Sequence, residues 1–230
     1  MKSLLIFTDW FAPGYKAGGP IRSVVNLVEN LEDMFTIYIF TSDRDLNDKH
    51  AFSDIASDTL VPFGVNSRVL YASPFFLKIK NISRIIEEVR PDTIYLNSMW
   101  SVYFTFCPLW INRNNSRVRM VLAPRGMLKT AALAVKPLKK KWFLQLLKKI
   151  VIKNDLIFHV TEADESLSVK QHFTNNVRLI GNFAGKLKEF STIEKKQGQL
   201  HLISISRIHP IKNTLFLVEL LTNHEFEGSI

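Results

Sequence analysis

Two segments of the chain place groups that can bind phosphates directly after runs typical of β-strands. Near the start, the run Ser3–Phe7 leads into a loop that contains Gly18 and Gly19 and ends at Pro20. The first backbone N–H groups of a helix have no acceptor within the helix, so they can bind an anion. Glycines at this point let a ligand approach the backbone closely. The alternative is a turn that needs glycine for its positive φ angles. The loop has neither the dinucleotide fingerprint nor the lysine of a phosphate loop, so by itself it indicates an anion site only weakly.

Two cations follow another strand-like run near the other end of the chain. Arg207 comes directly after the predicted strand His201–Ser206, and Lys212 precedes the predicted helix Asn213–Thr222. Both are expected beside a helix N-terminus at the carboxyl end of a strand, where open α/β sheets bind ligands. A guanidinium fork and a lysine ammonium suit a diphosphate. The alternative is a pair of solvated surface cations.

Further strand-like runs end in residues that suit a sugar or a phosphate. Arg125 and Gly126 follow one of them, and an arginine there can bind a phosphate or a sugar carboxylate, or form a salt bridge within a turn. Asn97 and Trp100 follow another, and they suit the hydroxyls and the flat faces of a sugar, although a tryptophan in this position is also typical of a core. Glu162 follows a third strand, where an acid also favours the first turn of a helix.

The elements that must position these residues alternate along the chain. The predicted strands are Leu4–Thr8, Thr36–Thr41, Ser67–Tyr71, Thr93–Leu96, Arg119–Ala123, Leu156–Val160 and Val177–Ile180. The predicted helices are Pro20–Leu31, Ile79–Val89, Val102–Arg113, Pro137–Lys153 and Glu162–Gln171. Continuously apolar strands separated by helices predict a parallel sheet covered on both faces, so the predicted fold class is α/β with a doubly wound parallel sheet.

The composition changes after this region, which predicts a second domain. Residues 183–198 are rich in charge and read as a linker, and residues 199–230 then supply one strand and one helix. One strand and one helix cannot bury a core. We therefore expect a complete domain over residues 1–182, and a second domain that has only begun at residue 199 and continues past Ile230.

Composition limits the classes of function and the compartment. The chain is 47% apolar, carries a formal net charge of +9 and contains one cysteine, Cys107, within an apolar run. A single cysteine excludes an intramolecular disulfide, so a reducing cytoplasm is expected, and Cys107 is expected to be buried. No cluster of Asp, His or Cys indicates a metal site. The positive charge suits nucleic acid, an anionic bilayer or polyanionic ligands such as sugar nucleotides.

The helix predicted at Pro137–Lys153 concentrates this charge. Residues 136–153 hold seven lysines and no acidic residue. An apolar stripe recurs every fourth residue, at Leu138, Trp142, Leu146 and Ile150. A basic amphipathic helix predicts contact with a membrane surface through Lys139, Lys140, Lys141 and Trp142. The alternative is a core-packed helix with a solvated lysine face. Nucleic acid is not expected, because the aromatic residues lie on the apolar stripe and not among the lysines.

The motifs in their order resemble the nucleotide-sugar-dependent glycosyltransferases of family 4, the retaining group with the two-domain GT-B fold. They are the glycine loop, Ala-Pro-Arg-Gly-Met-Leu at 123–128, the lysine-rich helix, Thr-Glu-Ala-Asp-Glu at 161–165 and Ser-Arg-Ile-His-Pro-Ile-Lys-Asn at 206–213. The resemblance implies a Rossmann-like, acceptor-side domain over residues 1–182. It also implies that a truncated, Rossmann-like domain for the nucleotide sugar begins at residue 199.

The resemblance implies an activity as well. This is metal-independent transfer of a hexose, with retention, from a UDP- or GDP-sugar to a glycan or lipid-linked acceptor, without any further cofactor. It implies a role in surface polysaccharide biosynthesis, such as O-antigen, capsule or exopolysaccharide, in the cytoplasm or peripherally on the inner face of the membrane. Gly18 and Gly19 would face the donor diphosphate and the acceptor. Arg207 and Lys212 would neutralise the departing diphosphate, and Arg125 would lie near the transferred sugar.

The chain departs from the family pattern in two places. The Pro-Asn-Gly turn before the linker reads Gly181-Asn182-Phe183, so Asn182 alone matches. The glutamate pair that flanks the sugar and the ribose would lie beyond residue 230, so residues 1–230 alone are expected to be inactive. The chief alternative is a non-catalytic α/β module that binds a nucleotide or a partner protein. A Rossmann-type oxidoreductase or epimerase is disfavoured by the missing glycine fingerprint.

Overall fold

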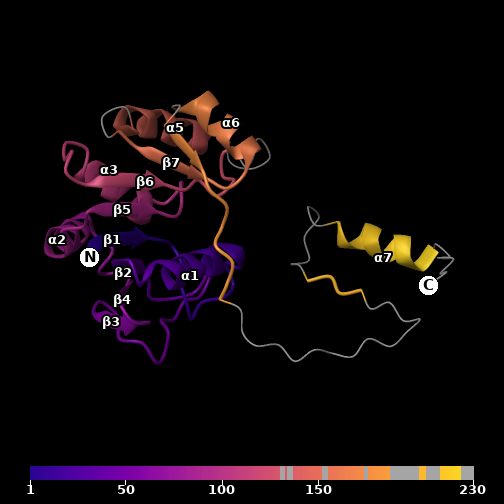
Figure 1. Ribbon diagram of the computed structural model, residues 1–230, viewed down its shortest axis with the longest axis horizontal. Coiled ribbons are helices and arrows are strands. Elements are labelled where there is room, and N and C mark those ends of the chain that lie inside the picture. The colour runs from indigo at the N-terminus through magenta and orange to yellow at the C-terminus, as the bar shows by residue number, and fades with distance from the viewer. Residues whose placement is uncertain are drawn as a thin grey trace. The chain divides into compact units, whose positions relative to one another are not determined.

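The chain divides into two units, of which the first is an α/β domain. The computed structural model describes residues 1–129, 133, 137–151, 155–173, 176–186, 202–205 and 213–223, and it divides into the units Met1–Lys186 and Leu187–Ile230 (Figure 1). The strands of the first unit are β1 (Lys2–Phe7), β2 (Phe35–Ser42), β3 (Leu60–Phe63), β4 (Ser67–Ala72), β5 (Thr93–Leu96), β6 (Arg119–Leu122), β7 (Ile157–Val160) and β8 (Val177–Leu179). Its helices are α1 (Gly19–Leu31), α2 (Ile79–Val89), the π-helix η1 (Val102–Phe106), α3 (Cys107–Ile111), α5 (Pro137–Val151) and α6 (Ala163–His172).

The eight strands form one sheet in the order β3-β4-β2-β1-β5-β6-β7-β8. Every neighbouring pair is parallel except β3 and β4. The order reverses between β1 and β5, because the chain moves outward from β1 to β4 and then returns to the other side of β1. This confirms the predicted doubly wound, Rossmann-like fold, and such a reversal opens a crevice at the carboxyl ends of the strands.

Strand β1 shows how the sheet acquires two cores. Its side chains alternate between faces: Leu4 and Ile6 pack with the buried side of α1, whereas Leu5 and Phe7 pack in the cluster that includes α2, α3 and α5. All four are buried. A strand buried on both faces has to be apolar at every position, which explains the unbroken run that predicted it. Cys107 is buried in the second cluster, as expected.

The predicted strands and helices of the first unit are present, with boundaries that differ by a few residues. Two features differ from the prediction. Strand β3 was not predicted, because it is a short antiparallel edge strand interrupted by Pro62, which has no N–H to donate. The stretch predicted as one helix from Val102 begins with the π-helical turn η1 and continues as α3.

The end of the first unit is tied to α1. Asn26 Nδ2 donates to the carbonyl oxygen of Phe183 at 3.0 Å, and Asn30 Nδ2 donates to that of Ala184 at 3.2 Å. Lys186 Nζ lies 3.8 Å from a carboxylate oxygen of Glu32. Residues 183–186, which were assigned to the linker, therefore pack against the first unit. The division into two domains stays a prediction.

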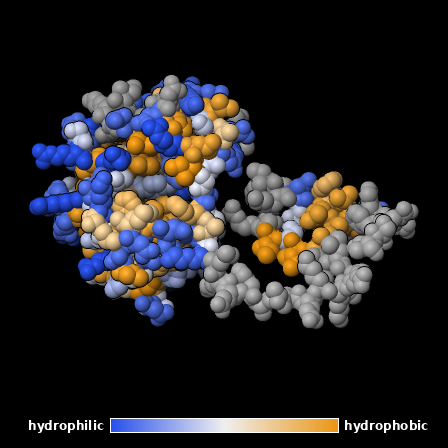
Figure 2. All heavy atoms as spheres, in the orientation of Figure 1, coloured by the Kyte–Doolittle hydropathy of each residue, from blue (hydrophilic) through white to orange (hydrophobic). Residues whose placement is uncertain are grey.

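The second unit contains helix α7 (Thr214–Asn223) and the described residues 202–205, which have no regular secondary structure. The predicted strand His201–Ser206 is wrong for its described part, since residues 202–205 pair with no other strand there. No described residue of α7 is buried, and apolar side chains dominate the described surface of this unit (Figure 2). Leu202, Ile203, Ile205, Leu215, Phe216 and Val218 are all more than half exposed.

Candidate functional site

The glycine loop after β1 is held by one carboxylate. Asp45 Oδ2 accepts hydrogen bonds from the backbone N–H groups of Tyr15 at 2.7 Å and Lys16 at 3.0 Å. Those backbone donors lower the pKa of Asp45 although burial acts in the opposite direction. The Lys16 side chain pairs with Asp48. A Cβ added at Gly14 would lie 2.9 Å from the carbonyl oxygen of Phe11, so this glycine is required by packing within the loop.

Gly18 and Gly19 stand at the N-terminus of α1, and they differ from Gly14. Gly18 is the N-cap with φ +69°, a left-handed conformation that glycine adopts without strain. A Cβ added at either Gly18 or Gly19 would meet no described atom within 4 Å. The amides are less available than the sequence indicates. Gly18 N donates to Tyr15, Ile21 N donates to Gly18, and proline has no N–H, so Gly19 offers the one amide in this turn without a partner among the described residues.

Replacing Gly19 with alanine is expected to leave stability unchanged within about 0.5 kcal/mol, because Gly19 has open space and an ordinary φ. The same substitution is expected to weaken ligand binding at this turn, since the added methyl group would occupy the space above the free amide. Gly18→Ala is the control, because its positive φ should cost about 1 kcal/mol without a ligand. Urea unfolding and UDP or GDP titration of both variants test this, and equal destabilisation by the two would contradict it.

Arg125 lies just beyond the carboxyl end of β6, and its guanidinium contacts residues of β5 and of the segments that follow β5 and β8. Its guanidinium donates from Nε to Asn97 Oδ1 at 2.7 Å, from Nη1 to Asn182 Oδ1 at 2.6 Å, and from Nη2 to the Tyr95 hydroxyl at 3.0 Å. Arg125 has φ +54°, so the backbone turns sharply after the strand. Three of the predicted site residues therefore meet in one cluster. The oxygens that accept from Arg125 are all neutral. The alternative expectation, a turn in which Arg125 forms a salt bridge, is therefore not observed.

Tyr95 and His159 extend this cluster, because the Tyr95 hydroxyl contacts both Arg125 and His159. Tyr95 Oη lies 2.7 Å from His159 Nδ1, and His159 Nε2 lies 2.9 Å from the carbonyl oxygen of Ile180. A carbonyl oxygen only accepts, so Nε2 carries the proton and Nδ1 of the neutral ring accepts from the tyrosine. Burial raises the pKa of Tyr95 to about 12, so its hydroxyl keeps the proton that this bond needs. The Tyr95 oxygen is then left to accept from Arg125.

His159 is expected to make the first unit less stable in acid. Burial, and to a smaller extent the charge of Arg125, lower the pKa of His159 below its ordinary value near 6.5. The unfolded chain then takes up the proton first as the pH falls, so the contribution of His159 is complete above about pH 6.5 and is lost below it. Thermal unfolding at several pH values should show a smaller acid loss in His159→Gln. His50→Gln, at an exposed histidine, is the control, and an unchanged profile in His159→Gln would contradict the assignment.

Two glutamates follow β7, and they have different roles. Glu165 is 2% exposed, and its carboxylate accepts from the backbone N–H of Gly126 and, at 3.0 Å, from that of Thr161. It therefore fixes the turn that carries Arg125. Glu162, the predicted ligand contact, is exposed and pairs with Lys129, with Oε2 2.5 Å from Nζ. Gly126 has φ +73°, so it is needed for the turn itself.

Asp9, at the end of β1, was not singled out from the sequence. Burial raises the pKa of its carboxyl, and hydrogen bonds with the side chains of Ser98 and Ser101 offset part of that rise. Ser101 also caps η1 by accepting from the N–H of Phe104 at 3.2 Å, and π-helical turns are frequent at functional sites. Such a carboxyl can hold or accept a proton beside a sugar hydroxyl. The sequence feature that could have indicated Asp9 is a single acidic residue directly after an apolar strand.

The aromatic and basic residues of α5 are arranged differently from the predicted stripe. The face that packs on the core carries Phe143, Leu147 and Ile150, whereas Trp142 is 73% exposed. The predicted stripe through Trp142 is therefore wrong, because the helix is rotated so that Phe143 meets Trp100 and Phe106. Trp100 contacts Phe143 edge-on, and the Lys140 ammonium lies 5.5 Å from its ring centroid. Its ring is thus used in packing.

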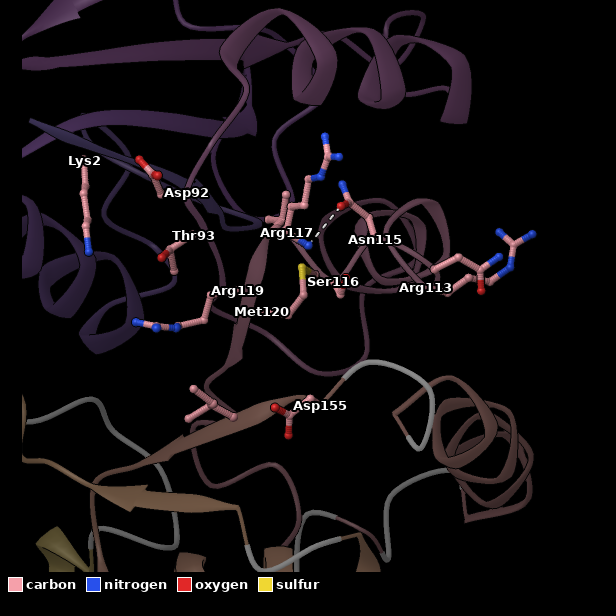
Figure 3. A pocket seen from close by; sticks show the side chains of 13 residues that line it. Lys2, Asp92, Thr93, Arg113, Asn115, Ser116, Arg117, Arg119, Met120 and Asp155 are labelled. Atoms are coloured by element: carbon pink, nitrogen blue, oxygen red, sulfur yellow. Dashed lines mark hydrogen bonds between the residues drawn. The ribbon is translucent and has the colours of Figure 1, made fainter.

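A hollow among the described residues lies at the opposite, amino edge of the sheet. It has a volume of about 880 Å³. Its lining includes Lys2, Thr93 and Arg119, the first residues of β1, β5 and β6, and also Arg113 and Arg117 (Figure 3). Arg113 stacks on Trp110, 4.2 Å from the ring centroid. No residue of this hollow belongs to the predicted site, so the basic hollow and the polar cluster around Arg125 occupy opposite edges of one sheet.

Comparison with known proteins supports the fold. No protein-family model matches the chain, and no curated protein sequence matches it. Among solved structures, sucrose-phosphate synthase from Thermosynechococcus elongatus matches with a TM-score of 0.54 and 15% identity, over 79% of this chain and 48% of that one. Another structure of sucrose-phosphate synthase from that organism matches over 81% and 90% of the two chains, with 14% identity and a TM-score of 0.48.

A further match is dTDP-glucose 4,6-dehydratase from Bacillus anthracis in complex with NAD, with a TM-score of 0.42 and 11% identity, over 70% of this chain and 54% of that one. The chain spans about half the length of the first synthase structure. At this identity the likeness concerns the fold, which is the mostly parallel, Rossmann-like sheet described above.

Several predicted residues fall outside the described part of the chain. They are Arg207, Lys212 and the side chain of Lys139. Within the described part, no group of three or more His, Cys, Asp or Glu side chains could hold a metal ion. Of the described helices, none is long and apolar enough to cross a membrane.

Proposed function

We propose that the protein is a glycosyltransferase that moves a hexose from a UDP- or GDP-sugar to a glycan or lipid-linked acceptor. The observation that carries the proposal is the cluster of Asn97, Arg125 and Asn182 at the carboxyl edge of the sheet. The fold likeness to a sucrose-phosphate synthase and the family resemblance of the motifs support it. Retention, independence of metal and a role in surface polysaccharide biosynthesis belong to the same proposal.

The proposed chemistry depends on stabilising a leaving group. As the sugar acquires oxocarbenium character, the nucleotide diphosphate takes the bonding electrons, and fixed donors aimed at that charge lower the barrier. In this proposal Arg207 and Lys212 are those donors, as the family resemblance implies. The acceptor hydroxyl attacks the anomeric carbon and releases its proton, and we assign the uptake of that proton to Asp9, a buried carboxyl at this edge.

We propose that residues 199–230 open the donor-side domain. The exposed apolar side chains of Leu202, Ile203 and Ile205 and of α7 would find core partners in further strands and helices of that domain. The first unit would then bind the acceptor, as the resemblance implies.

A preference for nucleotides tests this proposal against its alternatives. A glycosyltransferase should bind UDP or GDP more tightly than NAD or NADP, whereas a Rossmann-type oxidoreductase should show the reverse order. Calorimetric titration of the four nucleotides against the whole protein gives the comparison. A preference for NAD or NADP, or no binding of any of them, would overturn the proposal.

We also propose that α5 holds the enzyme peripherally at the inner face of the cytoplasmic membrane. Exposed Trp142 next to Lys140 and Lys141 suits an interface between lipid headgroups and water. Glutamate at Lys139, Lys140 and Lys141 is expected to lower binding to anionic vesicles on the order of a hundredfold, at roughly 1 kcal/mol per lysine. Vesicle sedimentation measures this. The control carries glutamate at the exposed Lys2, Lys49 and Lys170, and equal loss in both triple variants would contradict the assignment to α5.

A further inference from the structure

Arg125 is a half-buried cation without a counter-ion among the described residues. Five ion pairs are present there, and Arg125 belongs to none of them. A guanidinium taken partly out of water is costly unless an opposite charge or hydrogen bonds compensate it. Arg125 donates hydrogen bonds to three neutral oxygens and forms no ion pair with a described carboxylate.

No group that accepts a hydrogen bond from Arg125 carries a negative charge. Asn97 and Asn182 are amides, and Tyr95 stays a neutral phenol because burial raises its pKa to about 12. The pKa of His159 is lowered, mainly by burial, so at neutral pH the ring adds no charge. Glu165 is the buried carboxylate on the neighbouring helix, and its oxygens already accept from the backbone of Gly126 and Thr161.

The same three contacts orient the guanidinium and leave part of it available. An arginine side chain has five N–H groups, and three of those of Arg125 are used by Asn97, Asn182 and Tyr95. Two remain without a partner among the described residues, one on Nη1 and one on Nη2. An arginine whose position is fixed by neutral acceptors loses little side-chain freedom when it binds an anion, which favours affinity.

We propose that Arg125 binds a carboxylate or phosphate group of the substrate at the carboxyl edge of β6. On the proposed function, this makes the acceptor an acidic sugar or a sugar phosphate. The anionic oxygens of the ligand accept charge-assisted hydrogen bonds from the two remaining N–H groups. They bring a negative charge into direct contact with the guanidinium. Asn97, Asn182 and Tyr95 are positioning residues, because they act through Arg125.

The test is an NMR titration of the whole protein with inorganic phosphate, glucuronate and, as the neutral match, glucose. We expect phosphate or glucuronate, but not glucose, to shift the Arg125 side-chain resonance and those of the Asn97 and Asn182 amides. Arg125→Gln should weaken that binding at least tenfold. Arg125→Lys keeps the charge but loses the fork, and it should also bind more weakly. Urea unfolding of each variant shows that the protein titrated is folded.

Arg119→Gln is the matched control, because Arg119 is an exposed arginine in the basic hollow at the opposite edge. Anion binding that is lost in Arg119→Gln and retained in Arg125→Gln would overturn the inference, as would absence of binding by both anions. A UDP or GDP titration separates this outcome from the proposed function. Nucleotide binding that survives Arg125→Gln leaves the transferase proposal intact even if the anions fail to bind. Loss of nucleotide binding in Arg125→Gln, without binding of either small anion, assigns the charge to the donor and overturns the acidic acceptor.

Discussion

Replacing Glu165 with alanine is expected to lower the free energy of unfolding of the first unit by about 3 kcal/mol. The side chain is 2% exposed, and its two oxygens bind the backbone N–H groups of Gly126 and Thr161. Alanine leaves the N–H groups of Gly126 and Thr161 without their acceptor. A buried N–H group without an acceptor destabilises the folded state by the full cost of its desolvation. Because Gly126 follows Arg125 directly, the same change should also loosen the cluster at the carboxyl edge.

Urea unfolding followed by tryptophan fluorescence measures this effect. Glu162→Ala is the matched control, since Glu162 stands on the same turn but is exposed and pairs with Lys129 at the surface, a contact worth at most about 1 kcal/mol. Glu165→Gln should lie between the two, because an amide oxygen accepts from one backbone N–H while its NH₂ faces the other. Equal midpoints for Glu165→Ala and Glu162→Ala would show that the buried carboxylate does not hold the turn.

The second large effect is expected at the proposed donor site. Arg207→Ala and Lys212→Ala should each weaken binding of UDP or GDP by about 10- to 100-fold, because a hydrogen bond to a charged group contributes about 1.5–3 kcal/mol. The expectation rests on the match between Ser-Arg-Ile-His-Pro-Ile-Lys-Asn and the family motif. The two substitutions should not simply add if both side chains bind the same diphosphate.

Calorimetric titration of UDP and GDP against each variant gives the affinities. Arg119→Ala serves as the control for general loss of positive charge, since it lies at the amino edge of the sheet. The loss of affinity caused by Arg207→Ala should be smaller when uridine or guanosine, which lack the diphosphate, is titrated in place of UDP or GDP. Affinities that match those of Arg119→Ala would remove Arg207 and Lys212 from the donor site.

Most of the fold could be predicted from the sequence because the sheet is parallel and buried on both faces. Each of its central strands is a short, continuously apolar run, and the helices between them carry one apolar face. Strand β3 has neither property, since Leu60–Phe63 is exposed in part and contains Pro62. The rotation of α5 could not be predicted either. Apolar residues occur on two sides of this helix, and only contact with Trp100 and Phe106 selects the side that is buried.

The candidate site was predictable only where a motif marked it. Asn97 and Arg125 were named because each follows a strand, and Asn182 because it matches the family's turn before the linker. The parallel sheet brings all three to one edge. Tyr95 and His159 lie inside strands and look like core residues, so their hydrogen bonds depend on the register of β5, β7 and β8. Local sequence contains no information about that register. Glu165 was part of a motif, but its burial distinguishes it from the exposed Glu162 only in three dimensions.

The most direct test of the account is which edge of the sheet a sugar nucleotide protects. Hydrogen–deuterium exchange of the whole protein, with and without UDP-hexose or GDP-hexose, can be read for both edges in one experiment. We expect slower exchange of the Gly19 amide and of residues 98–101 and 125–128, with residues 113–119 unchanged. Protection confined to residues 113–119, or no protection at either edge, would contradict the assignment of sugar transfer to the carboxyl edge.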